Sequence, residues 1–116
     1  MKIRILDNTI RIRLTRSEVS RLFETGEVEA VTGFVSTPLH YFLRQYEGQQ
    51  LKADFHDNQI VVLIPMVMAE RLHHTDEVGF EEESGPLVIL VEKDFVCLDN
   101  SLEDQSDNYP NPNMTC

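Results

Sequence analysis

The sequence predicts a mainly β protein with two short α-helices, built from a ββαββ unit that occurs twice. Apolar and polar residues alternate near the start of the chain with the two-residue period of half-buried strands. Residues 1–28 align with residues 51–78 at an offset of 50, and nine of the 28 pairs are identical. Pro38-Leu39 and Pro86-Leu87 each lead into an apolar run. The shared order of these features predicts a duplication, and a chance match of two common patterns is the alternative.

The first unit begins with two strands, KIRIL and TIRIRL, around an Asp7-Asn8 turn. Thr15 and Glu18 have the spacing of a capping box at a helix start. Gly26 can end that helix in the left-handed conformation. Two further strands are expected at about 27–34 and 39–46.

The second unit repeats this order, with strands LKADFH and QIVVLI around Asp57-Asn58. Pro65 is placed at the first helical position, where its missing N–H costs nothing, and Met66–His74 is the expected helix. Strands at about 77–82 and 87–93 close the unit. We therefore expect one domain, residues 1–98, made of repeats at about 1–49 and 50–98, and an acidic tail rich in Pro and Asn at 99–116.

A longer motif within the second unit consists of DNQIVVLIPMVMAERLHHTDEVGF, a Gly-containing turn and LVILVEKD. It resembles the swapped-hairpin barrel family typified by AbrB and MraZ, in which a strand ending in Ile-Pro precedes a short helix and a Gly-Asp-Glu-Val-like strand. Gly26-Glu27-Val28 and Asp76-Glu77-Val78 stand at the position of that last motif. The resemblance implies a pseudo-twofold, swapped-hairpin-like barrel formed by duplication within one chain.

The two ends of the chain carry a second resemblance. The segments MKIRI, IRIRLTRSEV, VEKDFVCL and NYPNPN, with a late cysteine, are similar to those of a family of small, acidic, uncharacterised bacterial proteins. This resemblance implies a bacterial protein without an assigned activity.

Charge and composition exclude several classes of function. The 116 residues carry 20 acidic and 10 basic side chains, a net charge of −10 that argues against a generally basic nucleic-acid binder. The apolar run at 60–68 is too short to cross a bilayer, so no membrane association is expected. Two cysteines without an apolar leader segment predict a reducing, cytoplasmic location.

Basic residues nevertheless gather in the first hairpin and at the start of the first helix. AbrB-type proteins contact DNA through arginines near this hairpin, so the resemblance implies a phosphate-contacting face. Two alternatives are a solvated strand face and pairing with acids of the same chain, because residues 76–107 alone sum to −10. The candidate nucleic-acid-binding residues are Lys2, Arg4, Arg11, Arg13 and Arg16.

The second hairpin is apolar on both faces. This pattern is typical of a strand buried on both sides, here under the tail, or of an interaction patch used by a partner or a second copy. The candidate interface residues are Val61, Leu63, Met66 and Met68. The tail itself is interpreted either as a disordered end or as an ordered strap docking through Leu102, Tyr109, Pro110 and Pro112.

Chemistry-bearing residues are few. Cys97, Cys116 and His73 could contribute to a zinc site, with free thiols as the alternative, and no other cofactor is expected. Phosphate-binding loops, nucleophile elbows and metalloprotease helices are absent from the sequence, so we do not expect an enzyme. The leading hypothesis is a non-catalytic protein-binding or regulatory module whose partner is another protein or a second copy of itself, and the alternative is a DNA-binding regulator.

Overall fold

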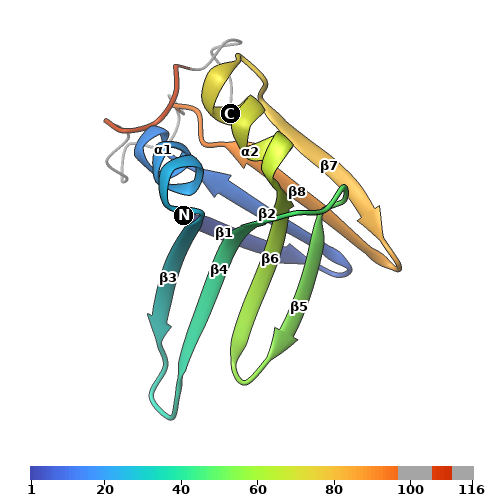
Figure 1. Cartoon of the computed structure of the whole chain (residues 1–116). Helices are drawn as coiled ribbons and strands as arrows, with labels where there is room; N and C mark the ends of the chain where they lie inside the picture. Colours follow the sequence, from blue (N-terminus) through green and yellow to red (C-terminus); the bar gives the residue numbers. More distant parts are fainter. Residues whose placement is uncertain (97–105, 111–116) are drawn as a thin grey trace.

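The computed structural model describes residues 1–96 and 106–110 and confirms the duplicated ββαββ order. The elements, in chain order, are β1 (Lys2–Leu6), β2 (Thr9–Leu14), α1 (Arg16–Thr25), β3 (Glu27–Gly33), β4 (Pro38–Tyr46), β5 (Lys52–His56), β6 (Gln59–Pro65), α2 (Met66–His74), β7 (Gly79–Ser84) and β8 (Leu87–Lys93). The fold is mainly β, with the two helices side by side at one end (Figure 1).

The strands form two four-stranded sheets, which we call sheet A, in the order β1-β2-β8-β7, and sheet B, in the order β3-β4-β6-β5. Each sheet combines one hairpin from each repeat. A parallel pair, β2 with β8 or β4 with β6, lies at the centre, and the hairpin partners flank it in antiparallel orientation. Exchanging the two repeats turns the strand order of one sheet into that of the other, so the predicted pseudo-twofold layout is present.

The strands do not close into a barrel, which corrects that part of the prediction. The strands form two separate sheets, and β1, β7, β3 and β5 are their edges. Exposed charges on edge strands discourage further pairing, and β1 exposes Lys2 and Arg4 while β7 exposes Glu81 and Glu83. The sheets meet near the helices and diverge toward the hairpin ends (Figure 1). This divergence leaves the inner faces apart at one end of the molecule.

The core lies between the sheets and under the helices. Alternate strand residues such as Leu14, Leu43, Ile64 and Val91 are fully buried, as the period-two pattern predicts. Leu22 of α1 is buried in the same cluster. Among the described residues, no helix is long and apolar enough to cross a membrane.

Local signals placed most element ends correctly. The Thr15 N–H donates to Glu18 Oε1 at 2.9 Å, and Gly26 ends α1 with a φ of 87°. Several strand ends differ from the prediction by one or two residues. Pro65 has extended backbone, with φ −55° and ψ 140°, so it ends β6 instead of opening the helix, and α2 spans Met66–His74 as predicted. The strand expected from Glu77 begins at Gly79 instead.

Candidate functional site

The basic hairpin lies on the outer face of sheet A, the face turned away from sheet B. Register pairs Lys2 with Arg13 and Arg4 with Arg11, which places the four side chains on one face because opposed residues point the same way. The intervening apolar residues of β2 are buried. Arg16 instead opens α1, so the structure brings together four of the five predicted residues.

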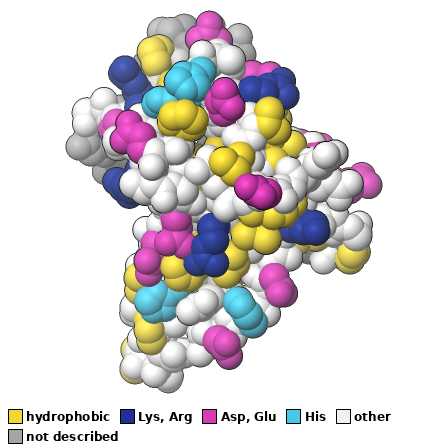
Figure 2. All heavy atoms as spheres, in the orientation of Figure 1, with side chains coloured by type: hydrophobic (Ala, Val, Ile, Leu, Met, Phe, Trp, Pro, Cys, Tyr) yellow, Lys and Arg dark blue, Asp and Glu magenta, His cyan; other side chains and the backbone are white. Residues whose placement is uncertain are grey.

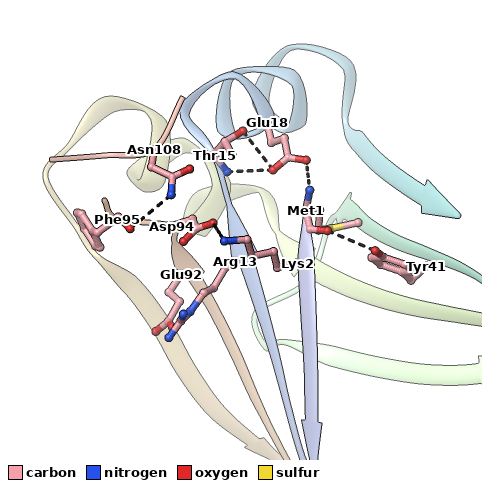
Figure 3. Close-up of polar contacts among 10 residues, drawn as sticks. All are labelled: Met1, Lys2, Arg13, Thr15, Glu18, Tyr41, Glu92, Asp94, Phe95 and Asn108. Carbon is pink, nitrogen blue, oxygen red and sulfur yellow. Dashed lines mark hydrogen bonds and ion pairs between the residues drawn. The ribbon is translucent and has the colours of Figure 1, made fainter. Parts of the chain in front are cut away.

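Two acidic residues at and just after the end of β8 pair with three of these four basic side chains. Glu92 Oε1 lies 3.4 Å from Arg11 Nε and 3.0 Å from Arg13 Nε. Lys2 Nζ lies 2.9 Å from the buried carboxylate of Asp94 (Figure 3). The parallel pairing of β2 with β8 produces these contacts by setting Arg13 opposite Glu92. The acids of the same chain therefore pair with the hairpin, and phosphate contact stays a prediction.

The described part of the tail docks beside the end of β8. The Tyr109 N–H donates to Asp94 O at 2.9 Å, and the Val96 N–H donates to Tyr109 O at 2.6 Å. The buried Asn108 donates through Nδ2 to Phe95 O at 3.5 Å (Figure 3). Residues 106–110 thus act as the strap that one interpretation of the sequence expects. The other residues assigned to that strap, Leu102 and Pro112, lie outside the described residues.

The strap also contacts the start of α1. The Arg16 N–H donates to Asp107 O at 3.1 Å, and the Ser17 hydroxyl donates to the carboxylate of Asp107. This hydroxyl, then that of Thr15, holds the pKa of Asp107 below its ordinary value, with a smaller contribution from Arg16. The strap therefore supplies an acceptor and a negative charge at a helix N-terminus, where both are favourable.

A cavity of about 500 Å³ lies between the end of α2 and the strap. Lys93 lines it and is only 6% exposed. Its Nζ donates to Thr75 O at 2.9 Å and lies 5.0 Å from the centre of the Tyr109 ring. Burial lowers the pKa of Lys93, and the charges of Asp76 and Glu77 partly oppose this effect. The lysine ties the end of the helix to the strap, which is a structural role.

Of the three predicted zinc ligands, the described part of the chain contains His73. His73 stacks on Phe23 with ring centres 4.7 Å apart, so it packs on the other helix. Cys97 and Cys116 lie outside the described residues. No group of three or more His, Cys, Asp or Glu side chains in residues 1–96 and 106–110 is arranged to hold a metal ion.

The predicted interface residues do not form one surface. Val61 lies on the outer face of sheet B and is buried beside Phe42. Leu63 shares that face in the same strand, Met66 is exposed at the start of α2, and Met68 packs against the core. Over the part of the surface where sheet B lies, charges of both signs and histidines are interspersed with hydrophobic side chains (Figure 2). Burial on both faces of β6 thus accounts for its apolar pattern.

The divergence of the sheets opens an apolar cleft of about 370 Å³. Residues of β1, β2, β5, β6 and β8 line it, namely Ile5, Thr9, Ile10, Ala53, Asp54, Phe55, Ile60 and Leu87. Ile5 and Phe55 occupy equivalent positions of the two repeats and are 60% and 63% exposed. Large apolar side chains from both repeats thus stand open to solvent around one hollow.

Sequence reasoning missed this cleft. The alternating pattern correctly turns Ile5 and Phe55 toward the space between the sheets, but it cannot show that the sheets diverge there. A signal was available in the repeat alignment, since both first hairpins carry a large apolar residue two positions before the Asp-Asn turn. The pattern indicates the direction of a side chain, whereas its exposure depends on the packing of distant strands.

Comparison with known proteins leaves the function open. Neither curated proteins nor solved structures yield a match, so the resemblance to AbrB and MraZ stays an interpretation of short motifs. A model of a family of unknown function, DUF7009, matches residues 1–113. The chain therefore belongs to the DUF7009 family, whose function is not known.

Proposed function

We propose that this chain is a non-catalytic protein-binding module and that the cleft between the sheets is its binding site. One observation carries the proposal: Ile5 and Phe55 are each about 60% exposed around an apolar hollow. Fully burying one large apolar side chain contributes roughly 1.5–3 kcal/mol, so covering both of them is favourable. Clustered apolar exposure of this kind marks interaction sites on soluble proteins.

The lining of the cleft favours an uncharged, apolar protein segment as its occupant. Asp54 is the one charged residue among the described residues that line the cleft. A charged segment would lose hydration there, and a basic one could find one carboxylate at most. The sheets diverge toward their hairpin ends, so a segment can enter from that side (Figure 1). We expect this binding to take place in the bacterial cytoplasm, as the family resemblance and the cysteine usage suggest.

The test compares two substitutions of an exposed apolar residue by aspartate. Phe55→Asp places a charge in the cleft, whereas Val67→Asp does so at a residue of similar exposure on α2. A partner captured on the wild-type chain is purified, and its Kd is measured by titration calorimetry. We expect Phe55→Asp to weaken binding about ten- to a hundredfold and Val67→Asp to leave it within about twofold. Equal Kd values for the two variants would contradict the proposal.

A further inference from the structure

The hairpin formed by β3 and β4 extends beyond the rest of sheet B. The parallel pairing of β4 with β6 begins at His40 opposite Gln59, so residues 31–39 have no neighbour on β6. All eight residues from 31 to 38, which we call the hairpin tip, are exposed. Figure 1 shows this tip projecting past the ends of β5 and β6.

The hairpin tip is apolar and uncharged, which is unusual in this chain. No Asp, Glu, Lys or Arg occurs from Ala30 to Leu39, although the whole chain has a net charge of −10. Phe34 and Val35 are among its most exposed large hydrophobic residues. The corresponding turn of the second repeat follows three consecutive glutamates, residues 81–83. The two repeats have therefore diverged, and only the first presents an apolar tip.

We propose that the hairpin tip of one chain inserts into the cleft of a second copy. The inference rests on the proposed function of the cleft as a protein-binding site, and it names the occupant. The tip brings Phe34 and Val35 to an apolar hollow without burying a charge, which is the chemistry that the cleft lining favours. Because the tip is exposed on its own chain, it does not fill its own cleft.

This contact joins two different surfaces. In a pair of chains joined by a single contact, one cleft and one tip stay unused, and they can bind further copies unless the rotation between copies closes a ring. Each copy carries a net charge of −10, which opposes association at low ionic strength. Added salt screens this repulsion, so assembly grows with both protein concentration and salt.

The experiment measures molar mass by size exclusion with light scattering over a range of concentrations, at low and high salt. Val35→Asp disables the tip, Phe55→Asp disables the cleft, and Val67→Asp is the matched control. Wild type and the control are expected to exceed the mass of a dimer at high concentration. Each of the other two variants alone is expected to stay monomeric. An equimolar mixture of the tip and cleft variants is expected to form a dimer and nothing larger, since each retains one intact surface.

Two outcomes overturn the inference. One is a strictly monomeric wild type at every concentration and salt, and the other is an associating wild type whose tip and cleft variants do not combine. Circular dichroism of each variant checks that the exposed substitutions leave the fold intact. If self-association fails but a purified foreign partner still discriminates Phe55→Asp from Val67→Asp, the proposed function stands without the self-contact. If neither association is found, both proposals fail.

Discussion

Single acidic residues connect parts of the chain that are distant in sequence. Glu92 forms ion pairs with Arg11 and Arg13, and Asp107 accepts a hydrogen bond from the first turn of α1. Counting charges along the sequence shows an acidic second half and a basic first hairpin, but it does not say which acid meets which base. Exposed pairs of this kind contribute little each, typically below 1 kcal/mol. Their value here is that they hold the first hairpin, β8 and the strap in one arrangement.

Asp107→Asn should make the free energy of unfolding depend less on pH in the acidic range. The folded pKa of Asp107 lies below its ordinary value of 3.8, so the carboxylate stabilises the fold above that value. This contribution is lost as the pH falls through the lower folded pKa. The free energy of unfolding in urea, measured between about pH 5 and pH 2, should therefore fall less steeply in the variant than in wild type. Asp7→Asn, on an exposed turn, controls for the lost charge, and identical slopes in all three proteins would refute the prediction.

At the scale of elements, much of the fold could be predicted because the signals are local. Alternation identified the strands, and Thr15 with Glu18 and Gly26 set the ends of α1. The partners of each strand were not predictable in the same way, since β2 pairs with β8 through hydrogen bonds that no nearby residue encodes. The ion pairs of the basic hairpin and the cleft both follow from that pairing. The basic residues could therefore be identified from the sequence, but their ion pairs could not. Nothing in the sequence shows that Glu92 pairs with Arg11 and Arg13.

Gly79 at the start of β7 gives a prediction with a matched control. A Cβ at this position would lie 2.5 Å from Val91 O, which belongs to the backbone of the neighbouring strand. Gly79→Ala should therefore lower the free energy of unfolding by about 1–3 kcal/mol, as overpacking does. Gly33→Ala adds the same methyl group where no atom lies within 4 Å, so its effect should stay within about 0.5 kcal/mol. Urea unfolding followed by circular dichroism measures both, and equal stabilities would contradict the steric argument.

For the whole molecule, the exchange of hairpins between repeats makes the two halves interdependent. Each sheet has its central parallel pair between a strand of the first repeat and a strand of the second. Neither repeat alone contains a sheet of more than two strands, and isolated hairpins are marginally stable at best in water. The duplicated sequence therefore behaves as one folding domain rather than as two.

A chain divided at Gly48, between β4 and β5, tests this interdependence. We expect each fragment alone to lack a cooperative unfolding transition, because each has lost the central pairs of both sheets. Mixing the fragments should restore the circular dichroism spectrum and the dispersed proton NMR signals of the intact protein. A fragment that unfolds cooperatively on its own would show that one repeat is sufficient for a stable fold.

The connectivity of the sheets also sets the order in which they can close during synthesis. In sheet B, His40 pairs with Gln59, 19 residues further along the chain. In sheet A, Arg13 meets Glu92 across 79 residues. Each doubling of loop length adds about 0.6 kcal/mol of entropic cost, so closing sheet A costs about 1 kcal/mol more. During synthesis, β6 leaves the ribosome well before β8. Until β8 is made, β2 has no parallel partner strand. The first hairpin to be made is therefore the last to join its sheet.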